Sequence, residues 1–110
     1  MNEKLTEERY LDQHVFYGLK NLNTGFDAPA IKYFNAADFH TVLKRCEKLG
    51  VVIMGIEPFK DGFYFDAAFP EEFDHAGIKW YYIAFEKFES LDMELQYAAS
   101  YCVPWISALF

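Results

Sequence analysis

The stretch from Asn35 to Ala67 constrains the fold more than any other part of this sequence. Asn35 can cap a helix in which Asp38 is the third residue, because a short polar side chain accepts a hydrogen bond from the backbone there. Gly50 follows at the position that favours a left-handed C-cap. The apolar residues between them recur every three or four positions, as on one face of a helix, and they are Phe39, Val42, Leu43, Cys46 and Leu49. We therefore expect a helix from residue 36 to residue 49.

A β-hairpin is predicted directly after this helix. Residues 51–56 are too few and too rich in β-branched side chains for a helix, so they are typical of a strand. Residues 60–62, with the sequence Lys-Asp-Gly, are a turn signal, and residues 63–67 are predicted to form the returning strand. Helix, strand, turn and strand thus follow one another without a break.

Before this unit, the sequence predicts a helix, a loop and a short strand. The helix begins at Thr6, its cap, and runs to about Leu22, with apolar residues at helical spacing. Asn, Gly and Pro residues among positions 23–29 indicate a loop. Residues 30–34 favour a short strand, with Ile31 and Tyr33 on one side of it.

After the hairpin, the sequence predicts a loop, a helix, a strand and an apolar tail. Residues 69–77 form an acidic stretch that is typical of a solvated loop. Residues 78–90 fit both a helical stripe and a strand, and the Ala-Phe-Glu-Lys-Phe-Glu continuation favours the helix. Residues 95–103 alternate bulky and small side chains, which predicts a strand that ends at Pro104. We expect the uncharged tail to fold back over the sheet, with docking on another chain as the alternative.

Together these elements predict a single α+β domain over residues 1–110, in which an N-terminal helix precedes a ferredoxin-like β-α-β-β-α-β unit. That arrangement is a four-stranded antiparallel sheet with helices on one face. Strands 30–34 and 63–67 would be central, and strands 51–57 and 95–103 would lie at the edges. A different α+β sandwich, with the N-terminal helix inserted in the core, is the alternative.

Charged residues are unevenly distributed along the chain. The net charge is −7, and residues 1–56 carry seven acidic and seven basic side chains. Residues 57–94 carry ten acidic side chains against three lysines, and residues 95–110 carry no charge. This distribution disfavours binding to nucleic acid, whose phosphates need basic side chains, and favours a basic protein or peptide. A charge that merely keeps the chain in solution is the simpler alternative.

Composition also bears on cofactors and on location. Neither a Cys-x-x-Cys pair nor histidines at ligand spacing are present, and no phosphate loop or dinucleotide fingerprint is found, so we predict no metal and no cofactor. Cys46 is expected to be a small core residue. The start of the chain is polar, and no apolar run is long enough to span a bilayer, which predicts a cytoplasmic protein that does not engage the membrane.

Three functions follow from these observations, and the one that we favour is a non-catalytic binding or regulatory module. It would engage another protein, or a second copy of itself, and inhibitors that neutralise a partner are one instance of this class. Surplus aromatic residues, the acidic middle segment and the apolar tail support it. The candidate binding residues are Tyr64, Glu71, Glu72, Asp74, Tyr97, Tyr101 and Trp105.

The two other functions are a small-molecule-binding domain and an enzyme. The binding domain would have a pocket between the sheet and the helices, lined by Tyr64, Tyr82, Tyr97 and Tyr101. The candidate groups of an enzyme would be His40, Glu57, Asp66, Asp74 and His75. No recognisable motif places a nucleophile beside these groups, so catalysis is the least favoured of the three.

Overall fold

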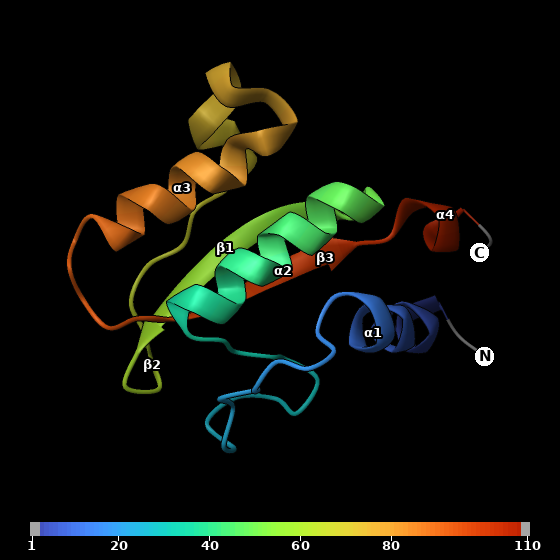
Figure 1. Cartoon of the computed structure of the whole chain (residues 1–110), viewed down its shortest axis with the longest axis horizontal. Helices are drawn as coiled ribbons and strands as arrows, with labels where there is room; N and C mark the ends of the chain where they lie inside the picture. The colour runs from blue at the N-terminus through green and yellow to red at the C-terminus, as the bar shows by residue number, and fades with distance from the viewer. Residues whose placement is uncertain (1–2, 109–110) are drawn as a thin grey trace.

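The computed structural model describes residues 3–108, with the backbone alone at residues 3–5, 74–76 and 78. Its elements in chain order are α1 (Glu3–His14), α2 (Ala36–Leu49), β1 (Val52–Lys60), β2 (Phe63–Tyr64), the 3₁₀-helical segment η1 (Pro70–Lys79), α3 (Trp80–Glu89), β3 (Gln96–Cys102) and α4 (Pro104–Ser107). In Figure 1, α2 lies on the sheet and runs along the direction of β1 and β3, α3 lies beside β1, and α1 lies near α4. The fold is α+β.

The helix α2 forms where the sequence predicts it. The side chain of Asn35 accepts a hydrogen bond from the backbone N–H of Asp38 at 2.8 Å. Gly50 adopts a left-handed conformation, with φ of 80°, and its N–H donates to the carbonyl of Cys46. Most of the predicted apolar stripe is buried, namely Phe39, Val42, Leu43 and Cys46. The prediction of a capped helix that lays one face on the core is therefore confirmed.

The sheet has three antiparallel strands in the order β2-β1-β3. The central strand β1 pairs with β3 over most of its length, from Val52 to Phe59, with a register shift between Ile53 and Gly55. In contrast, β2 pairs only with the last two residues of β1. The predicted strands at 51–57 and 95–103 are thus present as β1 and β3; β3 lies at an edge of the sheet as expected, whereas β1 is central.

The predicted ferredoxin-like arrangement is wrong, because neither of its central strands forms. Residues 30–34 contribute a single bridge, between Phe34 and Tyr97, on the outer side of β3. Residues 63–67 contribute the two-residue strand β2 and then leave the ladder, which resumes only where Ala68 bridges to Ile56. The sheet therefore has three strands, and β1 occupies its centre.

Side-chain hydrogen bonds explain why residues 23–33 do not form a strand. The amide of Asn23 donates to the carbonyls of Ala28 and Ile31, both at 2.9 Å. The hydroxyl of Tyr33 donates to the carboxylate of Asp27. Carbonyls that accept from a side chain in their own segment are not paired in a ladder, so the segment is an irregular loop until Phe34.

The helix α1 ends at His14, eight residues before the predicted end at Leu22. Gly18 adopts a positive φ of 75°, which a continuing helix does not allow. The guanidinium of Arg45 donates to the carbonyls of Val15 and Tyr17 at 2.9 and 2.8 Å, and it lies 3.8 Å from the centre of the Tyr17 ring. A side chain from α2 therefore binds the chain where α1 ends.

Two further expectations about the second half of the chain have different outcomes. Residues 69–77, predicted as a loop, form the 3₁₀ turns of η1, which include non-helical backbone at Phe73 and Gly77. Residues 78–90, predicted as a helix, do form one over Trp80–Glu89. Pro104 ends the strand as expected and begins α4.

The C-terminal tail, which the structure describes as far as residue 108, packs on α1. Ile106 is buried in the core, and the ring of Trp105 meets that of Tyr10 edge to face at 5.3 Å. The hydroxyl of Ser107 donates to the carboxylate of Glu7 at 2.7 Å. The tail thus packs on its own chain, as expected, but against α1 and not over the sheet, and residues 109 and 110 lie outside the described residues.

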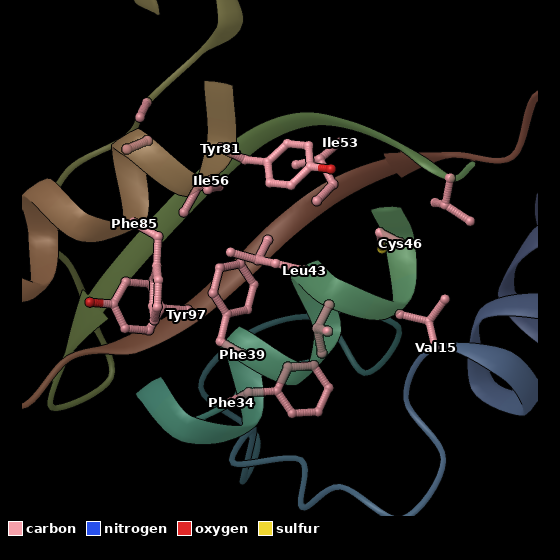
Figure 2. Close-up of a cluster of buried hydrophobic side chains, with 14 of the residues drawn as sticks. Val15, Phe34, Phe39, Leu43, Cys46, Ile53, Ile56, Tyr81, Phe85 and Tyr97 are labelled. Atoms are coloured by element: carbon pink, nitrogen blue, oxygen red, sulfur yellow. The ribbon is translucent and has the colours of Figure 1, made fainter. Parts of the chain in front are cut away.

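The core lies between the sheet and the helices α2 and α3 (Figure 2). Phe39 and Leu43 project from α2, and Phe85 projects from α3, toward Ile56 of β1 and Tyr97 of β3. All five side chains are buried. Burial of side chains of this size is the main source of stability in a domain of this length.

Tyr97 is the most highly connected residue of this core. It is fully buried, and it exchanges both backbone hydrogen bonds with Phe34. Its ring stacks on Phe39 at 5.1 Å and meets Phe85 edge to face at 5.1 Å. Its hydroxyl donates to the carboxylate of Glu89 at the end of α3. The residue thus contacts the chain on every side of β3.

The N-cap of α2 provides a first test of this description. We expect Asn35→Ala to lower the free energy of unfolding by about 1 kcal/mol, because the N–H of Asp38 loses its acceptor. Asn35→Ser keeps an acceptor at this position, so it should lower the free energy of unfolding by only a small part of that amount. Urea unfolding followed by circular dichroism measures both changes, and equal losses for the two variants would contradict the capping role.

The Tyr97 hydroxyl provides a second test. Tyr97→Phe keeps the packed ring but leaves Glu89 without its donor, so we expect the free energy of unfolding to fall by about 1–2 kcal/mol. Tyr64→Phe is the matched control, because the Tyr64 side chain is exposed. We expect this variant to change the free energy of unfolding by less than about 0.5 kcal/mol. The same urea titration compares the two, and equal effects would show that the buried hydrogen bond contributes nothing.

Candidate functional site

Two hollows lie along the seam where α2 meets η1 and α3. The first, here called the edge hollow, has a volume of about 410 Å³ and lies beside the start of β1. The second, here called the helix groove, has a volume of about 470 Å³ and lies between the start of α2 and the end of α3. Both volumes fall in the range of roughly 300–1,000 Å³ that is typical of ligand pockets.

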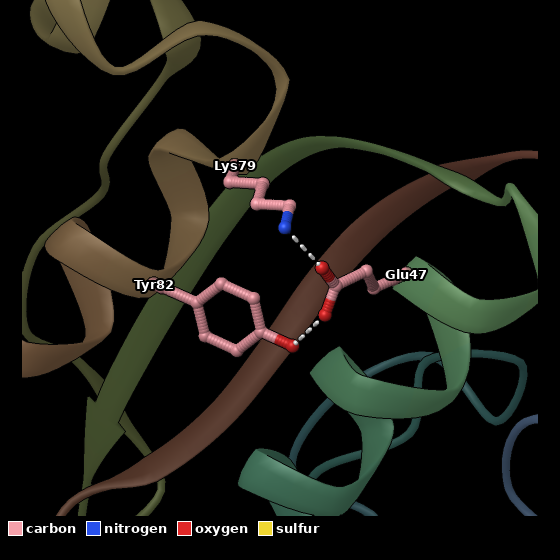
Figure 3. Close-up of polar contacts among 3 residues, drawn as sticks. All are labelled: Glu47, Lys79 and Tyr82. Carbon is pink, nitrogen blue, oxygen red and sulfur yellow. Dashed lines mark hydrogen bonds and ion pairs between the residues drawn. The ribbon is translucent and has the colours of Figure 1, made fainter.

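A polar cluster of Glu47, Lys79 and Tyr82 joins α2 to the start of α3 (Figure 3). The Lys79 ammonium lies 2.7 Å from one carboxylate oxygen of Glu47, and the Tyr82 hydroxyl donates to the other at 2.8 Å. Glu47 and Lys79 line the edge hollow, whereas Tyr82 lines the helix groove. The cluster therefore links α2 to α3 at the boundary between the two hollows.

The cluster has a definite protonation state. Hydrogen bonds from Lys79 and Tyr82 hold the pKa of the Glu47 carboxyl below its ordinary value. Burial, together with the hydrogen bond to Glu47, raises the pKa of the Tyr82 hydroxyl. At neutral pH, Glu47 is thus ionised and Tyr82 is protonated. Each of these groups is already held by a hydrogen bond or an ion pair within the cluster. This arrangement indicates that they position the scaffold and do not transfer a proton to a substrate.

The edge hollow has largely apolar walls. Val52 and Ile53 come from β1, while Trp80 and Tyr81 come from the start of α3. Cys46 lies at its α2 side, and burial raises the pKa of this thiol to about 12, so the thiol is neutral and behaves as an apolar group. The rings of Trp80 and Tyr81 meet edge to face at 6.2 Å, which makes this wall rigid.

Carboxylates without an ion pair lie next to the edge hollow. Pro70 lines the hollow, and the exposed residues Glu71 and Glu72 follow it in η1. Glu72 accepts a hydrogen bond from the N–H of Phe69 at 2.9 Å, which fixes its position. Neither glutamate has an ion-pair partner among the described side chains. Two exposed carboxylates therefore directly follow a residue that lines the hollow, while the charge of Lys79 is already paired with Glu47.

The helix groove is lined by small, aromatic and acidic side chains. Ala36 and Ala37 leave space at the start of α2, and the ring of His40 stacks on that of Phe85 at 6.1 Å. Glu86 and Glu89 line the opposite side. Because Glu89 also accepts the buried hydroxyl of Tyr97, the groove is connected to the core.

The structure places the predicted binding residues in different surroundings. Glu71 and Glu72 lie beside the edge hollow, and Tyr64 lies in β2 with 64 % of its side chain exposed. Tyr97 is fully buried, so it could contact a partner only after the core had opened. The Asp74 side chain lies outside the described residues.

Two of the predicted residues, Tyr101 and Trp105, do not line the edge hollow but neighbour residues that do: Tyr101 pairs with Ile53, and the Trp105 ring lies near Gly50. The buried hydroxyl of Tyr101 has no hydrogen-bond partner in the described part of the chain, and burial raises its pKa. Its ring packs edge to face on Phe16 at 5.4 Å. Trp105 is 44 % exposed, and its ring packs on Tyr10. A contact within the chain therefore explains why the tail carries this apolar ring.

The four tyrosines of the proposed small-molecule pocket do not converge. Tyr64 contacts Phe59, whereas Tyr82 bonds Glu47 between the two hollows. Tyr97 and Tyr101 belong to the core and its margin. The hollow that does form uses Trp80 and Tyr81, which are not among the predicted binding residues. Trp80 and Tyr81 line the hollow because they directly follow η1, at the start of α3.

Comparison with protein-family models, with curated proteins and with solved structures finds no match for this chain. Within residues 3–108, no helix is long and apolar enough to cross a membrane. No group of three or more His, Cys, Asp or Glu side chains that could hold a metal ion occurs in that part of the chain either. The function must therefore be inferred from the geometry alone.

The Glu47 cluster can be tested by its acid titration. We expect NMR titration of the Glu47 carboxyl to give a midpoint below that of an unperturbed glutamate, and Lys79→Met to raise this midpoint. Because the folded-state pKa is lowered, the stabilisation from this cluster is present above the unfolded-state pKa and is lost as the pH falls through the folded-state value.

The control for this titration removes a lysine elsewhere. Lys60 is paired with Asp61 and not with Glu47, so Lys60→Met should leave the Glu47 midpoint unchanged. A Glu47 midpoint that did not respond to Lys79→Met would contradict the ion pair.

Proposed function

We propose that this chain is a non-catalytic module that binds another protein, and that the surface of its partner is basic. The single observation that carries the proposal is the edge hollow, an apolar hollow next to two carboxylates that form no ion pair with any described side chain. Protein interfaces commonly combine an apolar anchor, seated in a pocket, with a polar rim that sets specificity. A basic partner would approach this rim faster and with fewer competing orientations than an acidic one.

The exposed apolar side chains near the edge hollow support this proposal. Val52 and Met54 of β1 are each 46 % exposed, and Phe69, which precedes η1, is also exposed. Exposed apolar residues that adjoin a hollow mark a surface that is suited to a partner. The acidic chain as a whole, with a net charge of −7, would add a long-range attraction to a basic protein.

The chemistry of the polar groups beside the hollow is better suited to binding than to catalysis. Glu47, Lys79 and Tyr82 hold one another in place, and none of them is left in an activated state. His40 stacks on Phe85 at the helix groove, with glutamates that line the same groove. A catalytic assignment would need a nucleophile or base that is held near a substrate cavity.

A small-molecule ligand is the second candidate function, and the volume of the edge hollow favours it. An apolar cavity of about 410 Å³ is large enough for a small ligand. A ligand that binds only the folded chain would raise its melting temperature in proportion to ligand concentration. A metabolite screen by thermal shift therefore separates this function from protein binding.

The protein-binding proposal is tested by capture with a charge-reversed variant. The chain carries an N-terminal tag and is incubated with lysate of its source cells, and the eluate is analysed by native mass spectrometry. We expect a stoichiometric second protein, whose binding weakens as salt is raised and falls by roughly tenfold with Glu71→Lys.

The matched control for this experiment is Glu94→Lys. Glu94 is also exposed, but it lies between α3 and β3 and does not line either hollow. The net charge changes by the same amount in both variants, so a selective loss with Glu71→Lys identifies the rim. Equal retention of the second protein by both variants would contradict this site, and the absence of any second protein would contradict the function.

A further inference from the structure

One stretch of the central strand has an open edge. Ile56 exchanges both backbone hydrogen bonds with Ala68 at 2.9 Å, and β2 pairs with the end of β1 at Phe59 and Lys60. After Ala68, the chain leaves the sheet for η1. On the side of β1 away from β3, residues 52–55 have no strand beside them in the described part of the chain. In Figure 1, this is the half of β1 that lies near the C-terminal end of α2.

The open edge lies beside the edge hollow. Val52 and Ile53 belong to both, and Trp80 and Tyr81 form the wall that faces them. Four strand residues span about 13 Å, enough to pair with a short extended segment. A sheet edge supplies backbone hydrogen bonds, and a neighbouring pocket selects one side chain of the added strand. Both components are present here on one surface.

We propose that residues 52–55 of β1 accept an extended segment of a partner protein as an additional antiparallel or parallel strand. The segment places an apolar side chain in the edge hollow and a lysine or arginine near Glu71 and Glu72. This inference rests on the proposed function and specifies how the partner is held. Backbone pairing supplies the affinity, while the hollow and the rim supply the specificity.

Charge distinguishes this occupant from a second copy of the chain. If two copies paired through this edge, the rim of one copy, with Glu71 and Glu72, would face the identical rim of the other. Like charges that face each other across an interface oppose association, whereas a basic segment is attracted. The Lys79 ammonium does not offset the rim, because it is already paired with Glu47 at 2.7 Å.

The experiment uses the full chain and peptides of defined sequence. Random twelve-residue peptides displayed on phage are selected on the immobilised chain, and the most enriched one is synthesised. We expect peptides in which apolar residues alternate with other residues and that carry lysine or arginine. On binding, the amide protons of residues 52–55 should exchange at least about tenfold more slowly, because they or their neighbours become paired.

Two N-methylated forms of the selected peptide provide the decisive comparison. In a strand, successive N–H groups point to opposite edges, so methylation at one set of alternate positions removes the donors that face β1. We expect this peptide to bind at least about tenfold more weakly, and the peptide methylated at the other set to bind within about twofold of the parent. Binding through side chains alone would make the two forms equivalent.

Variants of the chain confirm the location. Val52→Lys should weaken peptide binding by roughly tenfold, since it places a cation on the edge that receives a basic segment. Leu91→Lys is the matched control, because Leu91 is a similarly exposed apolar residue outside both hollows. Circular dichroism verifies that both variants are folded before binding is measured.

Each contrary result has a distinct meaning. Peptides that map to the helix groove and tolerate both methylation patterns would overturn the added strand and leave the protein-binding function standing. A stable dimer in sedimentation, dissociated by Val52→Lys, would assign the edge to a second copy and overturn the basic partner. If no peptide is selected, and the captured protein of the previous section is also absent, both the inference and the function are wrong.

Discussion

The fully buried phenol of Tyr97 is the constraint on which the rest of the structure depends. A buried hydroxyl requires a partner, and Glu89 at the end of α3 supplies it. The same residue pairs through its backbone with Phe34 and packs its ring against Phe39 of α2. One side chain of β3 thus fixes the relative positions of two helices and of the chain that leads into α2. The hollows along the helix seam exist because that geometry is held.

Polar contacts fasten α3 near both of its ends. Near the start of α3, Glu47 of α2 binds Lys79 and Tyr82, and near its end Glu89 binds Tyr97. A binding surface that is held in this way before the partner arrives loses little conformational entropy when it binds. The apolar walls of the edge hollow are fixed by aromatic packing in addition, so the surface combines rigid sides with an open strand edge.

Local signals in the sequence predict the parts of this fold that local physics determines. The cap at Asn35, the left-handed Gly50 and the β-branched run after it specify α2 and β1 without reference to the rest of the chain. The errors arise where distant residues decide. The binding of Arg45 to the end of α1 and the loop held by Asn23 have no periodic signature. For the candidate site, the acidic rim was predictable from composition, but the hollow was not, because its walls come from separate elements that meet only in the folded chain.

The contacts that fasten α1 also determine when this protein can fold during synthesis. Glu7 accepts its hydrogen bond from Ser107, 100 residues later in the chain, and Tyr10 packs on Trp105. A ribosome that adds about 5–20 residues per second needs roughly 5–20 s to make that intervening length. Throughout this interval the two residues that pack on Glu7 and Tyr10 have yet to be made. The contact between α1 and α4 therefore forms only after α2, α3 and the whole sheet between them have been translated, so α1 completes its docking late.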